Sequence, residues 1–250
     1  MKAMIFAAGL GTRLKPLTDS MPKALVPVAG KPLLEHVIVR LRDAGYDSLV
    51  VNVHHFPGQI KDFLATHDFG VEIHVSDESD KLLETGGGIR HAAPLLRPLD
   101  GPFLVHNVDI LSNLDFAWLR AQSRPDALST LLVNRRETSR YLLFDDRMRL
   151  VGWTNVNTGE VRSPYPDLDP AACRRLAFSG IHNMSPGIFD AMEALRMPER
   201  FSIIDFYLAA CARHPIYGAE APELRILDVG KPDALARAED MVRGQSASFL

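Results

Sequence analysis

Residues 4–41, MIFAAGLGTRLKPLTDSMPKALVPVAGKPLLEHVIVRL, contain an apolar run, a loop with two close glycines and an amphipathic segment, in that order. The apolar run 4–7 is short and is followed at once by Gly9, which predicts a buried strand. Apolar residues then recur at helical spacing over 34–41, after Pro32 and before Gly45, which predicts an amphipathic helix. The stretch therefore predicts a strand, a long loop and a helix.

The same alternation continues to residue 133. Apolar runs predict strands at 49–53, 71–75, 103–105 and 128–133, and helical spacing predicts helices at 59–67, 87–96 and 114–122. This order implies right-handed crossovers and an α/β, Rossmann-type, mostly parallel sheet with helices on both faces. Beyond it we expect a hairpin (141–144 and 150–153), a polar excursion (155–170), strands at 176–184 and 224–228, helices at 186–195, 202–213 and 232–243, and a fraying tail at 244–250.

Composition limits the class of protein. The chain has 250 residues, 46% of them hydrophobic, and its 28 Lys and Arg against 31 Asp and Glu give a formal net charge of −3. This balance argues against nucleic acid as the main partner. The apolar run 3–10 is too short to span a bilayer. Gly9 and Gly11 interrupt it and Arg13 and Lys15 follow, which argues against a secretory signal. With only two cysteines, the sequence predicts a cytoplasmic protein with no membrane partner and no disulfide framework.

The glycine loop does not fit two familiar phosphate loops. A dinucleotide-binding fingerprint needs a glycine where Leu14 stands, and a Walker A loop needs a Gly-Lys-Ser or Gly-Lys-Thr that the sequence lacks. What remains is a loop stiffened by prolines, with Arg13 and Lys23 among its cations. Taken alone, the two glycines fit a phosphate-binding loop and a simple tight turn equally well.

Several motifs taken together resemble a known family. GLGTRLKPLT (9–18), MPKALVPV (21–28) and GKPL (30–33) are followed by NVD (107–109), FSGI (178–181) and DVGKP (228–232). They resemble the sugar-1-phosphate nucleotidyltransferases, enzymes of GT-A-like fold that join a nucleoside triphosphate to a sugar phosphate. LETGGGI (83–89) is most similar to the N-acetylmuramate 1-phosphate uridylyltransferase group of that family.

The resemblance implies one nucleotidyltransferase domain over 1–250. Its nucleotide-binding half would cover 1–134 and its sugar-phosphate-binding half, with a small β-rich sugar-binding subregion, 135–228. The segment 229–250 would be a C-terminal helix and tail, which leaves no room for a trimerising β-helix. The protein would act as a monomer or small homo-oligomer.

The resemblance also assigns roles to residues. Arg13 would clamp the triphosphate and Lys23 would lie near the α-phosphate, as the two catalytic cations. Asn107 and Gly180 would contact the sugar, and the glycines at 86–88 would present exposed N–H groups. The nucleotide would be bound by Ala8, Gly9, Gly11, Thr12, Glu84 and Gly86.

Two carboxylates complete the implied site. Asp109 follows one predicted strand and Asp228 ends another, so both would face one crevice and hold Mg²⁺, which prefers hard oxygen ligands. A turn-capping role for Asp109 and a helix-capping role for Asp228 are the structural alternatives.

The implied reaction joins UTP and N-acetylmuramate 1-phosphate to give a nucleotide sugar and pyrophosphate. Arg162, inside the polar excursion, is the candidate partner for the lactyl carboxylate of that sugar. Alternatives are guanylyl, cytidylyl or thymidylyl transfer to another hexose or heptose 1-phosphate, a glycosyltransferase of the same fold, and a non-catalytic sensor of nucleotides or sugar phosphates.

Overall fold

The computed structural model describes residues 1–230 and 232–243, and the tail that we expected to fray lies outside them. The helices are α1 (Leu33–Asp43), α2 (Pro57–Thr66), α3 (Glu84–His91), α4 (Ala93–Leu96), α5 (Phe116–Ala121), α6 (Ile188–Ala194), α7 (Ile203–Ala210) and α8 (Pro232–Arg243). The strands are β1 (Lys2–Phe6), β2 (Pro27–Val28), β3 (Lys31–Pro32), β4 (Ser48–Val53), β5 (Glu72–Asp77), β6 (Phe103–Asn107), β7 (Ile110–Ser112), β8 (Ser129–Asn134), β9 (Arg140–Phe144), β10 (Leu150–Asn155), β11 (Glu160–Arg162), β12 (Arg174–Met184), β13 (Ile216–Glu220) and β14 (Ile226–Asp228).

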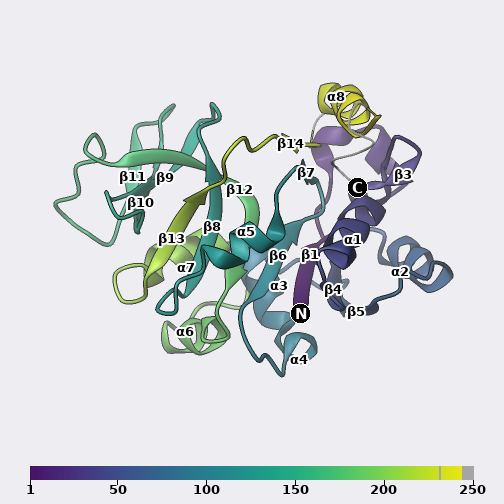
Figure 1. Ribbon diagram of the computed structural model, residues 1–250, viewed down its shortest axis with the longest axis horizontal. Helices are drawn as coiled ribbons and strands as arrows, with labels where there is room; N and C mark the ends of the chain where they lie inside the picture. Colours follow the sequence, from purple (N-terminus) through teal and green to yellow (C-terminus); the bar gives the residue numbers. More distant parts are fainter. Residues whose placement is uncertain (231, 244–250) are drawn as a thin grey trace.

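A central, mostly parallel sheet organises the chain (Figure 1). Its parallel part has the order β6, β1, β4, β5. β12 lies antiparallel beside β6, β8 lies antiparallel beside β12, and β13 runs parallel to β8. The carboxyl ends of β1, β4, β6 and β8 therefore meet at one edge, where ligands bind in sheets of this kind.

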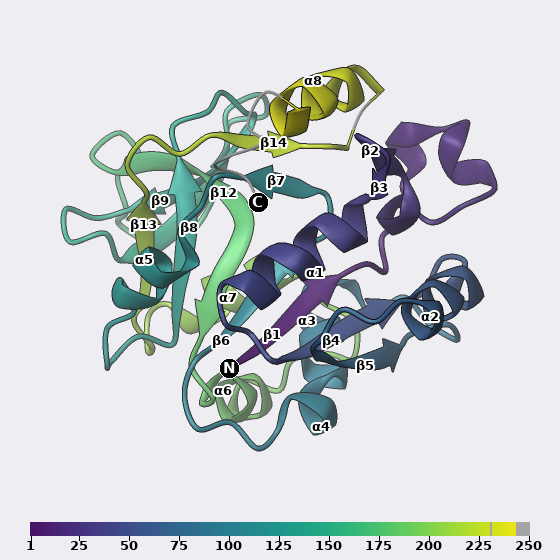
Figure 2. The ribbon, with the colours of Figure 1, turned by 45° about the vertical axis from the view of Figure 1, so that its right-hand side comes forward.

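Helices cover both faces of this sheet because neighbouring side chains on a strand point to opposite sides. Ile5 of β1 belongs to the core cluster that contains Ile38 of α1, which crosses one face in Figure 2. The next residue back, Met4, belongs to a second cluster with Ile89 of α3 and Phe206 of α7. The expected α/β architecture, with helices on both faces, is confirmed.

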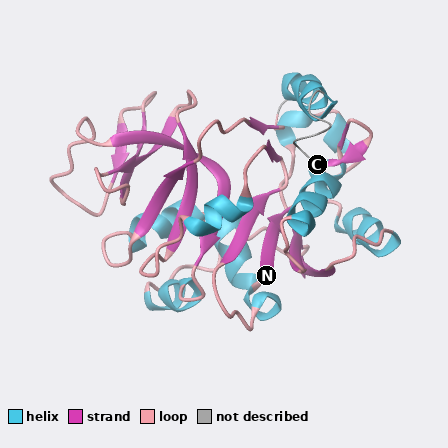
Figure 3. Ribbon diagram, viewed as in Figure 1, coloured by secondary structure: helices cyan, strands magenta, loops and turns pink. Residues whose placement is uncertain are grey.

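The second half of the chain adds a smaller β-rich region, seen as the group of strands at the left of Figure 3. The long β12 pairs with β9 near its start and with β6 near its end, and β9, β10 and β11 form an antiparallel extension. The pairing of β12 with β8 shifts register between Phe178 and His182, which marks a bulge in the strand.

The sequence patterns did not predict β2, β3, β7, β11 or β13, and all of these except β13 have only two or three residues. β14 lies inside the strand predicted at 224–228. β7 has three residues and pairs antiparallel with β14, opposing Ile110 to Asp228. The helix predicted at 87–96 is two helices, and α3 begins at Glu84, so it contains all three glycines. α8 has the predicted bounds. None of the described helices is long and apolar enough to cross a membrane.

Candidate active site

A cavity of about 490 Å³ opens at the carboxyl ends of β1, β4 and β6. Its lining includes most of the residues that the sequence singled out. The first loop contributes Ala8, Gly9, Gly11, Thr12 and Arg13. Lys23, Glu84, Asn107 and Asp109 also line it. Gly86, Gly180 and Asp228 are not among the lining residues.

The first loop is held by hydrogen bonds within the loop. Gly11 has a φ of 65°, and a Cβ there would come within 2.8 Å of the methyl group of Thr18. The Thr18 hydroxyl donates a 2.8 Å hydrogen bond to the Gly11 carbonyl, and Leu14 N–H donates to the same oxygen at 2.9 Å. Position 11 therefore requires glycine, both for its left-handed backbone and for the close approach of Thr18.

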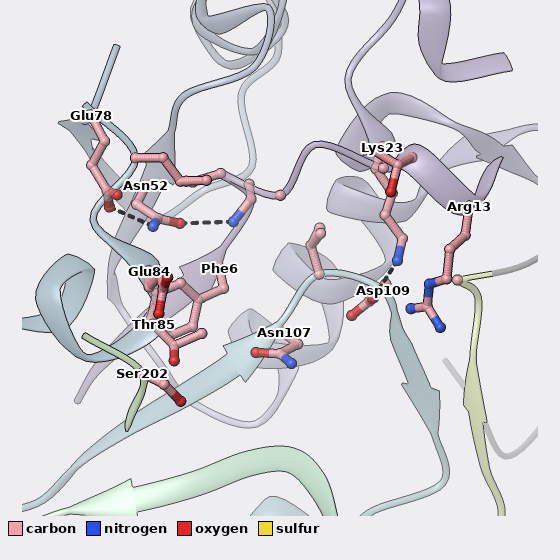
Figure 4. Close-up of a pocket in the computed structure, with 18 residues that line it drawn as sticks. Phe6, Arg13, Lys23, Asn52, Glu78, Glu84, Thr85, Asn107, Asp109 and Ser202 are labelled. Carbon is pink, nitrogen blue, oxygen red and sulfur yellow. Dashed lines mark hydrogen bonds and ion pairs between the residues drawn. The ribbon is translucent and has the colours of Figure 1, made fainter. Parts of the chain in front are cut away.

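One end of the cavity is charged. The Lys23 ammonium group donates to a carboxylate oxygen of Asp109, and the Lys23 residue is only 8% exposed (Figure 4). Arg13 points toward the same place, and its Nη2 lies 3.9 Å from Oδ2 of Asp228. Arg13, Lys23 and Asp109 thus line one end of the cavity and Asp228 lies beside Arg13, although these residues are up to 215 positions apart in the sequence.

The β7–β14 ribbon places the backbones of Asp109 and Asp228 side by side. Asp109 precedes β7 and Asp228 ends β14, and Val229 N–H donates a 2.8 Å hydrogen bond to the Asp109 carbonyl. Oδ1 of Asp228 is buried and has no hydrogen-bond partner among the described residues. A Cβ on Gly230 would lie 2.6 Å from that oxygen, so a side chain at position 230 would displace the Asp228 carboxylate.

The other end of the cavity is formed by a buried hydrogen-bonded relay that sequence reasoning missed. Oδ1 of Asn52 accepts from Ala7 N–H at 2.8 Å, and Nδ2 of Asn52 donates to Oε1 of Glu78 at 2.7 Å (Figure 4). Leu83 N–H donates to the second oxygen of Glu78 at 3.2 Å. Burial raises the pKa of the Glu78 carboxyl. The sequence signal that could have found these residues is their position: Asn52 lies near the end of the apolar strand β4, and Glu78 directly follows β5.

The three consecutive glycines have a different role from the one expected. Gly86 N–H and Gly87 N–H both donate to the Phe201 carbonyl, at 2.9 and 3.2 Å. A Cβ on Gly86 would overlap the Phe201 ring, and one on Gly87 would come within 2.5 Å of the Glu199 carbonyl. The expectation of exposed N–H groups is therefore wrong for these two glycines, and Gly86 packs against the 199–201 segment instead of lining the cavity.

Gly86→Ala is expected to lower the free energy of unfolding by about 1–3 kcal/mol, the usual cost of overpacking, because the added methyl group overlaps the Phe201 ring. Thermal and denaturant unfolding measure the change. Gly58→Ala is the matched control, since Gly58 lies in α2 and a Cβ there meets nothing within 4 Å. Equal stabilities of the two variants would show that the Phe201 contact does not constrain position 86.

Gly180 supports a site residue rather than facing the cavity. It has a φ of 72° inside the β12 bulge, and a Cβ there would come within 2.6 Å of Nδ2 of Asn107. The missing side chain makes room for the Asn107 amide, which does line the cavity. Thr85 and Ser202, two hydroxyl residues that sequence reasoning did not select, line it as well. They lie close together because Ile203 N–H donates to the Thr85 hydroxyl at 2.9 Å.

Arg162 already has a carboxylate partner. Its Nη2 donates to Oδ1 of Asp205 at 2.7 Å, and its guanidinium carbon lies 5.7 Å from the centre of the Trp153 ring. It is not among the residues that line the cavity. The structure therefore gives Arg162 a different partner from the substrate carboxylate proposed for it.

Comparison with known proteins identifies relatives of the whole chain. The family model described as nucleotidyl transferase matches residues 2–244. An N-acetylmuramate alpha-1-phosphate uridylyltransferase of Neisseria meningitidis is 39% identical, with 78% of this chain and 79% of the relative covered. One of Caulobacter vibrioides is 34% identical over 95% of both chains. The solved inositol-1-phosphate CTP transferase of T. maritima has a similar fold, with a TM-score of 0.76, 17% identity and coverage of 98% and 96%.

Proposed function

Because this chain belongs to the nucleotidyl transferase family, we propose that it transfers the uridylyl group of UTP to N-acetylmuramate 1-phosphate with the help of Mg²⁺. Sugar-1-phosphate nucleotidyl transfer is the activity of its relatives. One observation supports assigning this activity to the cavity. Arg13, Lys23 and Asp109 lie together at one end of it, and Asp228 lies beside Arg13.

The proposed reaction needs no protein nucleophile. An ionised oxygen of the sugar phosphate attacks the α-phosphorus of UTP, the bond to the bridging oxygen of the β-phosphate breaks, and pyrophosphate leaves with the electron pair. Catalysis is then alignment of two anionic substrates and neutralisation of their charge. The buried Lys23 suits a point charge at the α-phosphate, and the planar Arg13 fork suits the oxygens of the leaving phosphates.

The two carboxylates fit a magnesium site. Enzymes of this family generally use a divalent metal. Within 1–230 and 232–243 no three metal-binding side chains gather. Asp109, which lines the cavity, and Asp228, beside Arg13, would be the protein ligands. Mg²⁺ commonly takes one or two carboxylates and completes its shell with water and phosphate oxygens, and the buried, unpartnered Oδ1 of Asp228 suits such a role. When bound, the ion would neutralise phosphate oxygens of both substrates.

The two ends of the cavity support an orientation for the nucleotide. Arg13 and Lys23 are the cationic side chains in the described lining, so the triphosphate belongs at their end. The nucleoside then belongs at the end with Asn52, Glu78 and Glu84. Asn107 lies between the ends, and Thr85 and Ser202 lie beside Glu84 (Figure 4). Their amide and hydroxyl groups would be available to the sugar.

A pyrophosphate-release assay with four nucleoside triphosphates and a panel of sugar 1-phosphates tests the substrate assignment. We expect the highest kcat/KM for UTP with N-acetylmuramate 1-phosphate, because the two curated relatives named above, which together align with nearly the whole chain, carry that activity in their names. Better turnover with GTP, CTP or TTP would contradict the uridylyl assignment. Equal turnover of glucose 1-phosphate would contradict the sugar assignment.

A further inference from the structure

The edge of the sheet that holds the cavity continues past Asn107 to the end of β8. β12 runs antiparallel to both β6 and β8, so β6 and β8 end on the same side. Arg135 and Arg136 follow β8 directly. Two arginines therefore lie at the sheet edge that holds the cavity, outside the residues that line it.

The arginines of this region differ in their partners. Nε of Arg135 donates to Glu220 at 2.9 Å, and Nη2 of Arg174 donates to the same carboxylate at 2.8 Å. Arg162 donates to Asp205. The exposed Arg136 has no carboxylate partner within the described chain, and its Nη2 donates only to the Phe178 carbonyl, at 3.1 Å. Most of its five N–H donors are thus available.

Arg136 is nevertheless fixed against the β12 bulge. Its backbone N–H donates to Oδ1 of Asn134 at 3.0 Å, and Nδ2 of Asn134 donates to the Ser179 hydroxyl at 2.9 Å. Together with the Phe178 contact, these bonds hold residues 134–136 on 178–179. Gly180, which follows Ser179 in the chain, packs against the Asn107 side-chain amide. The guanidinium group therefore lies beside the strand segment that supports the proposed sugar contact.

We propose that Arg136 determines sugar specificity by binding a carboxylate substituent of the sugar 1-phosphate. The inference rests on the proposed function, since N-acetylmuramate differs from N-acetylglucosamine by a lactyl ether whose carboxylate needs a cationic partner. A guanidinium binds a carboxylate through two parallel N–H bonds, and a group already anchored by one bond loses less freedom when it binds. We therefore assign to Arg136 the role that the sequence suggested for Arg162. Arg162 is paired with Asp205, whereas no acidic side chain of the described residues pairs with Arg136.

Steady-state kinetics of Arg136→Gln with two substrates tests this assignment. We measure kcat/KM for N-acetylmuramate 1-phosphate and for N-acetylglucosamine 1-phosphate at saturating UTP, and take their ratio. The ratio is expected to fall about tenfold or more, on the scale of a charge-assisted hydrogen bond, while kcat/KM for N-acetylglucosamine 1-phosphate stays unchanged. Arg136→Lys, which keeps the charge but not the fork, is expected to retain part of the preference.

Arg135→Gln is the matched control, because it removes the same charge from the neighbouring residue, whose guanidinium is bound to Glu220. An unchanged ratio in Arg136→Gln, or an equal fall in Arg135→Gln, overturns the inference while the proposed function stands. A wild-type enzyme that does not prefer N-acetylmuramate 1-phosphate overturns the proposed substrate and this inference together. The wild-type ratio and the variant ratios thus distinguish the two failures.

Discussion

Lys23→Ala is expected to lower kcat by roughly 10² or more, the scale of losing one preorganised charge at a transition state. The Lys23 residue is 8% exposed and its ammonium group is held by Asp109, so its position is set before substrate binds. Arg13→Ala is expected to cause a loss of the same order, because Arg13 lines the same end of the cavity. Pyrophosphate release at saturating substrates measures both effects, and circular dichroism melting shows whether the variants fold.

Lys31→Ala is a suitable control for these substitutions. Lys31 forms a 3.0 Å ion pair with Glu35 on the surface, and its side chain is 52% exposed. Exposed pairs of this kind contribute about 0–1 kcal/mol, so neither stability nor turnover is expected to change much. A folded Lys23→Ala or Arg13→Ala variant with the turnover of Lys31→Ala would remove that residue from the reaction.

Asp228→Asn is expected to lower kcat by roughly 10²-fold or more and to raise the Mg²⁺ concentration needed for half-maximal rate. Its stability is expected not to fall. Oδ1 of Asp228 is buried without a hydrogen-bond partner in the described structure, and a neutral amide is less costly to bury than a carboxylate. A Mg²⁺ titration of the rate and a thermal melt without metal measure the two effects separately.

Asp233→Asn is the matched control for this change, since Asp233 is exposed in the first turn of α8 and is not among the cavity residues. Asp109→Asn should share the kinetic defect. Excess chelator should abolish pyrophosphate release by the wild-type enzyme and activity should return with added Mg²⁺. Undiminished turnover in chelator, or a normal metal dependence of Asp228→Asn, would rule out the proposed metal site.

Local sequence patterns were sufficient for the elements whose burial repeats regularly along the chain. The run at 4–7, the apolar spacing at 34–41 and the helix at 232–243 correspond to β1, α1 and α8. They were predictable because the spacing of apolar residues along a helix or strand shows which of its faces is buried. The three-residue β7 is too short to carry such a period. Its pairing with β14, which falls inside the strand predicted at 224–228, depends on contact between distant segments.

The sequence also indicated the candidate site residues, because its motifs resemble those of the sugar-1-phosphate nucleotidyltransferases and that resemblance assigns roles to glycines, cations and carboxylates that follow predicted strands. Only the tertiary structure decided which of them meet. Gly86 faces Phe201 and Gly180 faces Asn107, while Asn52 and Glu78 joined the cavity without any motif. Asp205 is the partner of Arg162, and Arg136 is left without a described acidic partner. The physical reason is that each of these contacts joins segments from different elements, whose proximity depends on strand order and on the β12 bulge rather than on any local spacing.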